Sequence, residues 1–294
     1  MTGAERGFLL LTSHLGDPER KPLTVAQFRN LHKQISKTPL PREERELCEK
    51  DLVSIGISRD FANRIVTLLE GEDQLDWYLK KAKDCIPITR ASDRYPISVR
   101  KRLGLDSPGC LWARGDLSYL ELPGVCLVGS RNLEPLNAAF AWEAGRQAAI
   151  QGYVLISGNA NGADQAAQNG ALENGGKVIS VVADRLLDHP AKENVLYLSE
   201  EGYDLPFSAI RALSRNRVIH TLGSLALVAQ CSLGKGGTWD GTVKNLKNRW
   251  TPVYCLDDGS KAMDALVQMG AQPISGTDLC KLKDLTPDIP WLFE

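Results

Sequence analysis

A series of short apolar segments, alternating with helical ones, is the feature that most constrains the fold. "VCLV" (125–128), "VLIS" (154–157), "KVISVV" (177–182), "LALV" (225–228) and "VYCL" (253–256) are separated by segments of helical character. Strands with so few polar positions are buried on both faces, and alternation with helices is typical of a parallel sheet covered by helices on both sides. The sequence therefore predicts a doubly wound α/β domain.

In the first part of the chain the spacing of the apolar residues is helical. Phe28, Leu31 and Ile35 recur at helical spacing. Three more segments of helical character follow, at 41–56, 59–71 and 73–84. We expect a small helical N-terminal domain over residues 1–82, followed by the α/β domain over residues 83–294.

Composition limits the classes of function. Hydrophobic residues make up 43% and charged residues 24% of the chain, as in ordinary globular proteins. Lys and Arg total 35 against 36 Asp and Glu, so any nucleic-acid binding must come from a local basic patch. No apolar stretch is long enough to span a bilayer, and the run "FLLL" near the start is too short for the core of a signal peptide. We expect a cytoplasmic protein without membrane contacts.

Cysteine and histidine predict no metal centre. The seven cysteines are odd in number and scattered, without C-x-x-C spacing, and the four histidines do not cluster with them. Cys126 and Cys255 lie inside apolar segments. We therefore expect buried free thiols in a reducing compartment, and no cofactor.

The turns that follow three of the predicted strands are rich in glycine. In an open parallel sheet ligands bind beyond the carboxyl ends of the strands, where backbone amides and helix N-termini suit an anion. The turn "SGNANGAD" itself holds no cation, so positive charge must come from neighbouring strand ends and from the segment "SRNR". The candidate phosphate-binding residues are Gly129, Ser130, Arg131, Ser157, Gly158, Asn159, Asn161, Gly162, Asp164, Arg215, Asn216, Arg217, Lys235, Gly236, Gly237, Thr238, Trp239 and Asp240.

Each of these signals has a structural alternative. "GSR" also suits a tight turn with a solvated arginine, and "SRNR" suits a solvated helix face. Trp239 could stack on a base or pack against the sheet. No G-x-G-x-x-G follows the strand at 125–128, which argues against an NAD enzyme, and the G-x-x-x-x-G-K-[ST] order of P-loop ATPases is missing.

The combined motifs resemble the DNA-processing protein A (DprA/Smf) family. The likeness covers roughly residues 86 to 275. The matching residues are Asp93, Tyr95 and Pro96; Pro108, Leu111, Trp112, Gly115 and Asp116; "VGSR" at 128–131; Ser157, Gly158, Ala160, Gly162 and Asp164; Gly170, Ala171, Leu172, Gly175 and Gly176; and Arg215, Asn216, Arg217 and Ile219.

The resemblance implies a Rossmann-like domain that binds single-stranded DNA and passes it to a RecA-type recombinase. It also implies a homodimer and no enzymatic activity. In that family the arginine of "VGSR" and basic residues near the glycine-rich turns contact the DNA backbone, which here implies Arg131, Arg215 and Arg217.

The sequence also departs from the family pattern. Asn161 stands where the family usually has Arg, Gln168 stands where it usually has His, and "GGTWDGT" (236–242) replaces "SGSLITA". The winged-helix segment that ends many members is not matched.

Two other classes of function stay open. A nucleotide sensor or N-glycosidic hydrolase could use the same pocket, although the Glu that such hydrolases need falls on Gly241 and Asp240 lies one residue early. A pure interaction module would bind neither DNA nor nucleotide.

Overall fold

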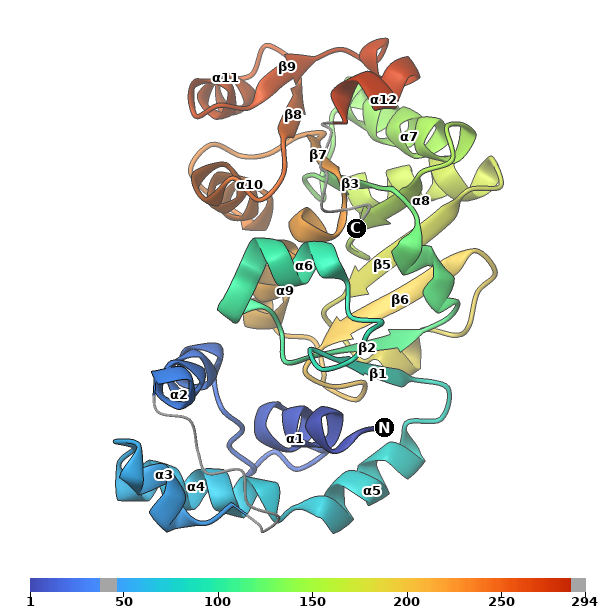
Figure 1. Cartoon of the computed structure of the whole chain (residues 1–294). Coiled ribbons are helices and arrows are strands. Elements are labelled where there is room, and N and C mark those ends of the chain that lie inside the picture. Colours follow the sequence, from blue (N-terminus) through green and yellow to red (C-terminus); the bar gives the residue numbers. More distant parts are fainter. Residues whose placement is uncertain (38–46, 287–294) are drawn as a thin grey trace.

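A single mixed sheet forms the centre of the computed structural model, which describes residues 1–37 and 47–286 (Figure 1). In the described residues nine strands follow the order β1-β2-β6-β5-β4-β3-β7-β8-β9. Their bounds are Ile86–Thr89 (β1), Cys110–Arg114 (β2), Gly124–Val128 (β3), Val154–Ser157 (β4), Lys177–Val182 (β5), Val195–Glu200 (β6), Leu225–Val228 (β7), Val253–Leu256 (β8) and Gln272–Ile274 (β9).

The strand pairing is parallel from β6 through β9, and β2 runs antiparallel to both of its neighbours. Alternate side chains of β3 enter two different cores. Val125 and Leu127 join the cluster on one face, and Cys126 and Val128 join the cluster on the other. Because both faces are buried, the central strands such as β3 and β7 are apolar at every position, as the sequence predicted. The doubly wound α/β fold is confirmed.

Helices cover both faces of this sheet. α7 (Pro135–Ile150) and α8 (Ala163–Glu173) contribute to the first cluster. The second cluster receives side chains from four other helices, which are α6 (Ile97–Leu103), α9 (Ala209–Leu222), α10 (Gly237–Asn248) and α11 (Lys261–Gln268). Short α12 (Leu282–Leu285) closes the described chain beside α7 (Figure 1).

In the residues that the structure describes, five helices precede the sheet. They are α1 (Gly3–Thr12), α2 (Val25–Lys37), α3 (Glu49–Ser54), α4 (Arg59–Leu69) and α5 (Glu72–Lys81). Leu31, Leu52 and Ile65 belong to a separate buried cluster of this part. Tyr78 of α5, however, meets Trp112 of β2 edge to face at 5.5 Å, so the helical part also shares the core of the sheet. The division between residues 82 and 83 stays a prediction.

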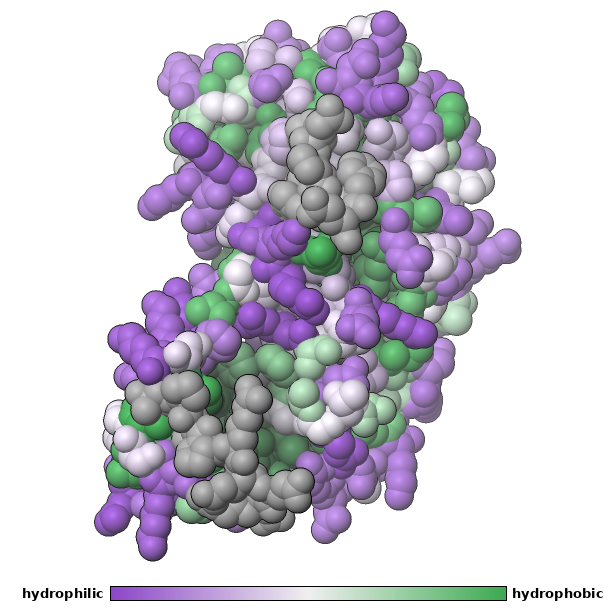
Figure 2. Space-filling model, in the orientation of Figure 1, coloured by the Kyte–Doolittle hydropathy of each residue, from purple (hydrophilic) through white to green (hydrophobic). Residues whose placement is uncertain are grey.

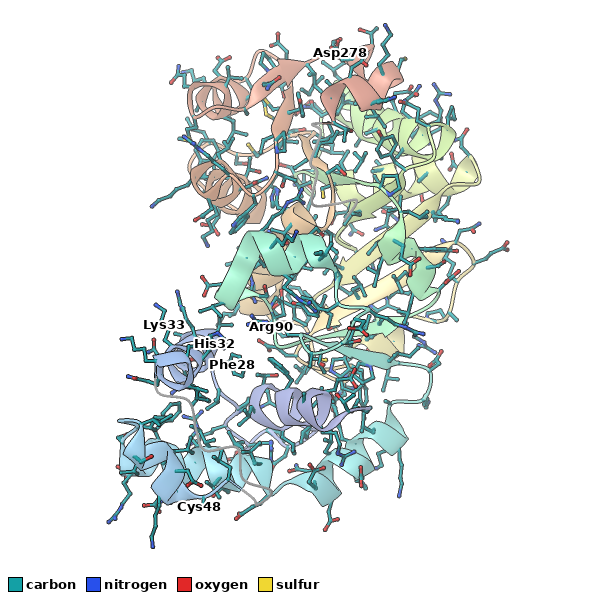
Figure 3. The ribbon with its side chains drawn as sticks, in the orientation of Figure 1. Phe28, His32, Lys33, Cys48, Arg90 and Asp278 are labelled. Carbon is teal, nitrogen blue, oxygen red and sulfur yellow. The ribbon has the colours of Figure 1, made fainter. Side chains whose placement is uncertain are left out.

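The helical part also meets the sheet through a cation–π contact. The guanidinium of Arg90, which follows β1, lies 6.0 Å from the ring of Phe28 on α2 (Figure 3). The ring of Phe28 in turn lies 5.2 Å from that of Phe8 on α1.

Some elements differ from the sequence-based expectation. The strand β2 and a 3-10 helix, η2 (Leu117–Glu121), were not among the predicted elements. The strands β6 and β9 and the helix α1 were not predicted either. The helical prediction over 41–56 falls partly outside the described residues. The elements η2 and β9 have five and three residues, which are too few to show a period.

The cysteines of the two central segments are buried as expected. Cys126 and Cys255 are fully buried, and all seven cysteines are free thiols. Within residues 1–37 and 47–286, no group of three His, Cys, Asp or Glu side chains could hold a metal ion. Over the same residues, no helix combines the length and the apolar character that crossing a bilayer requires.

A buried histidine predicts how stability depends on pH. His220 of α9 is fully buried, its Nδ1 accepts a hydrogen bond from Asn245 Nδ2 at 3.1 Å, and burial lowers its pKa from 6.5 to about 4. The unfolded chain binds this proton at higher pH than the folded protein. The free energy of unfolding therefore includes the full contribution of neutral His220 above pH 6.5. This contribution, about 3 kcal/mol in total, is lost as pH falls toward 4. Urea unfolding at a series of pH values should show this loss, and His220→Gln should reduce it. Parallel pH profiles of the two proteins would contradict the prediction.

Candidate functional site

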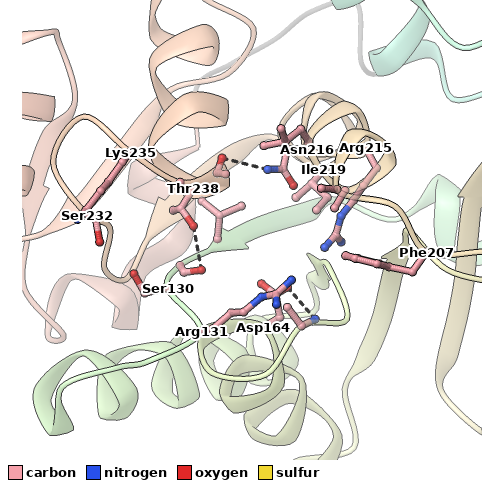
Figure 4. A pocket seen from close by; sticks show the side chains of 18 residues that line it. Ser130, Arg131, Asp164, Phe207, Arg215, Asn216, Ile219, Ser232, Lys235 and Thr238 are labelled. Carbon is pink, nitrogen blue, oxygen red and sulfur yellow. Dashed lines mark hydrogen bonds between the residues drawn. The ribbon is translucent and has the colours of Figure 1, made fainter.

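A pocket of about 430 Å³ lies where the winding direction of the sheet changes. From β3 the chain continues to β4, β5 and β6 on one side, whereas β7, β8 and β9 extend the other side. The turns after β3 and β7 diverge at this point, and such a crevice is where doubly wound sheets bind ligands. The turn after β3, the loop before α10 and α9 line the pocket (Figure 4).

The turn Gly129–Ser130–Arg131 is fixed by the loop that follows β7. The backbone N–H of Ser130 donates to Gln230 O at 2.9 Å, and the hydroxyl of Thr238 donates to Gly129 O at 2.9 Å. These bonds leave the exposed side chain of Arg131 at the pocket (Figure 4).

The turn after β4 packs directly behind Arg131. Ala163 N–H donates to Ser130 O at 3.1 Å. Gly162 has φ of +84°, and a Cβ on it would lie 2.3 Å from Arg131 O. Only glycine combines that backbone conformation with this close approach. The turn therefore sets the position of the arginine backbone, and it contributes Ala160 and Asp164 to the pocket wall.

Two opposite charges are buried beneath the pocket. Asp164 is 7% and Arg215 9% exposed, and Asp164 accepts a hydrogen bond from Ala160 N–H at 3.2 Å. Burial raises the pKa of Asp164 and lowers the pKa of Arg215, while each charge favours the ionised form of the other. Arg215 donates to Val181 O, and a Cβ on Gly158 would lie 2.0 Å from its Nη1. The pair thus holds the turn and the helix together.

The N-terminus of α10 faces the same pocket. Gly236 is the N-cap, and no side chain caps the helix there. Helix geometry leaves the N–H groups of Gly237 and Thr238 without an intrahelical acceptor, and the helix dipole adds partial positive charge. Asn216 of α9 donates to Gly237 O at 3.0 Å, and exposed Lys235 lines the pocket beside Gly236 (Figure 4).

The remaining wall is apolar, and its residues were not among those predicted from the sequence. Phe207, just before α9, is 56% exposed and lines the pocket, and Leu213 on that helix is 46% exposed and lines it as well. An apolar residue just before an N-cap ordinarily packs against the first turns of its helix, so the sequence offered no sign of this exposure.

Several predicted residues lie away from the pocket. Arg217 points to the other side of α9, where it pairs with Glu200 at 2.8 Å and donates to Asp106 O. The side chain of Trp239 packs against the second core cluster, as the structural alternative supposed, and Asp240 pairs with Lys244 at 2.7 Å. Ser157, Gly158, Asn159, Asn161 and Gly162 do not line the pocket either.

Comparison with known proteins identifies the family. Residues 87–283 match the sequence model of a family described as DNA recombination-mediator protein A. The chain belongs to this family. It is 31% identical over 193 residues to DNA processing protein DprA of Streptococcus pneumoniae and 27% identical over 165 residues to that of Bacillus subtilis. These alignments cover 59% and 52% of this chain, and 66% and 54% of the two relatives.

Solved structures agree with this assignment. The X-ray structure of DprA from Streptococcus pneumoniae superposes with a TM-score of 0.73 at 25% identity, covering 97% of this chain and 98% of that one. DprA from Helicobacter pylori has a TM-score of 0.58 at 23% identity, covering 69% of this chain and 97% of that one, which supports the fold. The resemblance to the DNA recombination-mediator protein A family is therefore confirmed.

One departure from the family pattern has a structural role here. Gln168, at the position usually held by His, donates to Ser157 Oγ at 2.9 Å and to Gly158 O. It thus stabilises the turn after β4 with an uncharged side chain.

Gly162→Ala should destabilise the protein by about 2–3 kcal/mol, because a β-carbon meets both an unfavourable φ and the Arg131 carbonyl. Gly259→Ala is the matched control. Gly259 also has positive φ, at +69°, but no atom lies within 4 Å of its Cβ position, so about 1 kcal/mol is expected. Urea unfolding of both variants measures the difference. Equal losses would show that the contact with Arg131 contributes nothing.

Proposed function

We propose that the pocket binds single-stranded DNA and that the protein acts as a recombination mediator. The observation that carries this proposal is the composition of the wall, in which exposed cations and a helix N-terminus line one pocket together with exposed apolar side chains. Proteins that bind single strands combine a positively charged surface for the backbone with aromatic surfaces for the bases.

The phosphates would lie on the side of Arg131 and Lys235. Arg131 can donate two hydrogen bonds to one phosphate, and the uncapped N-terminus of α10 supplies amides for another. Arg215 reaches the pocket from below but already donates to Val181 O, so its contribution is mainly electrostatic.

The bases would lie on the side of Phe207. Its exposed ring offers a stacking surface that accepts every base, because each base has a π-face. Phe207 is therefore the proposed stacking residue. Trp239, for which stacking was one of two predicted roles, packs its side chain on the core.

The comparisons support this proposal without extending to the whole protein. The family is named for recombination mediation, and the Helicobacter pylori relative is described as binding single-stranded DNA. The chain spans 66% and 54% of the curated relatives it matches. The RecA-type recombinase as partner, the homodimer, the cytoplasmic location and the absence of enzymatic activity belong to the same proposal.

Mononucleotide binding is the competing function. The pocket volume of about 430 Å³ also suits a single nucleotide. N-glycosidic hydrolysis is less well supported, because Asp240 pairs with Lys244 and Gly241 stands where such hydrolases have Glu. Titration of oligonucleotides of increasing length against a mononucleotide separates the two. A strand predicts affinity that rises with length, whereas equal affinities would favour the nucleotide sensor.

Arg131→Ala should weaken the binding of single-stranded DNA about tenfold, the value of one charged hydrogen-bonded contact. With Arg131, Lys235 and Arg215 facing the strand, two or three phosphates are neutralised, so log affinity against log salt should slope at about −1.4 to −2. Arg131→Ala should reduce this slope by about 0.7.

Fluorescence anisotropy over a range of salt concentrations measures both effects. Arg185→Ala, which removes an exposed arginine outside the pocket, is the matched control. A salt slope that Arg131→Ala leaves unchanged would contradict the phosphate contact.

Phe207→Ala should lower affinity for single-stranded DNA by roughly tenfold, because stacking contributes about 1–3 kcal/mol per base. Phe207→Trp should retain the affinity, since it preserves an aromatic surface. Ile210→Ala is the control, because Ile210 is 80% exposed in the first turn of α9, three residues after Phe207, but does not line the pocket. If Ile210→Ala and Phe207→Ala weaken binding equally, the effect is not stacking.

A further inference from the structure

A second, larger groove lies at the amino ends of the strands, on the side of the sheet away from the pocket described above. Its volume is about 940 Å³, and Gly124 and Ser224, at the start of β3 and β7, lie in its wall. The pocket described above lies beyond the other ends of the same strands. The two sites therefore do not overlap.

Two neighbouring segments of the chain form most of this groove. Residues 93–98 lead into α6, and residues 115–124 include η2. Tyr95 fixes one segment against the chain that leads to the other, because its buried hydroxyl donates to Pro108 O at 2.8 Å. Asp93 and Asp116 both carry the family resemblance, yet neither has a part in the proposed DNA site. The fold therefore fixes the shape of this groove, and the proposed DNA binding does not account for it.

The floor of the groove is apolar and reaches the surface. Ile86 of β1 is 42% and Ile97 40% exposed, and half-buried Leu117 and Leu120 line the groove with them. Hydrophobic residues surface near the middle of the face shown in Figure 2, beside the position of α6 in Figure 1. Exposed apolar side chains that gather in a groove are typical of a protein-binding surface.

The rim of the groove is acidic. Asp93, Asp116 and Glu121 are exposed on it, against one cation, Arg94, among the described residues that line it. Three carboxylates would repel the phosphates of a nucleic acid and attract lysine or arginine side chains. The charge of this groove is therefore opposite to that of the exposed residues of the DNA pocket.

We propose that this groove binds a cationic amphipathic segment of a partner protein. Apolar side chains on one face of such a helix fill the floor, and Lys or Arg residues beside them meet the three rim carboxylates. The proposal is independent of DNA binding, because the groove and the pocket share no residue.

The test uses the whole protein and a fluorescein-labelled helical peptide of Leu and Lys, with a Leu–Glu peptide of the same length as a second probe. The rim variant combines Asp93→Asn, Asp116→Asn and Glu121→Gln. The control variant combines Asp60→Asn, Glu70→Gln and Asp73→Asn, which remove the same charge from exposed positions of the helical part. Thermal melting establishes that both variants are folded.

The Leu–Lys peptide should bind the wild type and the control variant equally, and the rim variant about tenfold more weakly, since three exposed ion pairs are lost. Ile97→Ser should also weaken binding, because the floor contributes apolar contact. The Leu–Glu peptide should not bind. Equal weakening in the rim and control variants, equal binding of the two peptides, or no binding of the Leu–Lys peptide would overturn the proposal. Failure of DNA binding alone would leave the proposal standing, because the groove and the pocket share no residue.

Discussion

Backbone contact between the turns that follow β3, β4 and β7 is the constraint on which the pocket depends. Ser130 stands at the centre of it, since its N–H bonds Gln230 O and its carbonyl accepts from Ala163 N–H. Neither bond depends on side-chain identity, but the bond from Ala163 depends on the absence of a β-carbon at Gly162, which would lie 2.5 Å from Ser130 O. The candidate site is therefore a property of the sheet and its turns, to which Arg131 and Lys235 are added at the surface.

Arginine side chains that lie largely below the surface help to position α9 through their hydrogen bonds and ion pairs. Arg211, Arg215 and Arg217 all lie on α9, yet each makes a different set of contacts. Arg211 donates to Ala183 O and to Ser199 Oγ, Arg215 contacts the turn after β4, and Arg217 pairs with Glu200. A buried ion pair contributes little net stability against an apolar pair of the same size, but removal of one partner is costly. These arginines therefore fix the position of α9 between the pocket and the helical part.

Much of the fold and part of the site could be predicted from the sequence. The strands buried on both faces could be predicted, because short apolar runs such as "LALV" alternate with helical segments, a pattern that is typical of a parallel sheet covered by helices. The strand-end rule predicted Arg131, Lys235 and Thr238, and the structure brings these three residues together at one pocket. The segment "SRNR" also predicted Arg217, but residues 215 and 217 of one helix point about 200° apart, so both cannot face the same side. Phe207 was missed because solvent exposure of an aromatic residue depends on neighbours that are distant in the sequence.

The order of the strands has a consequence for the behaviour of the protein in concentrated solution. β1 and β9 lie at the two edges of the sheet, with four and three residues. Each contains a proline, Pro87 in β1 and Pro273 in β9, and proline has no N–H to offer an incoming strand. Short edges interrupted in this way are poor templates for growth of the sheet by a second chain. The fold thus protects a long, largely apolar sheet from edge-to-edge aggregation.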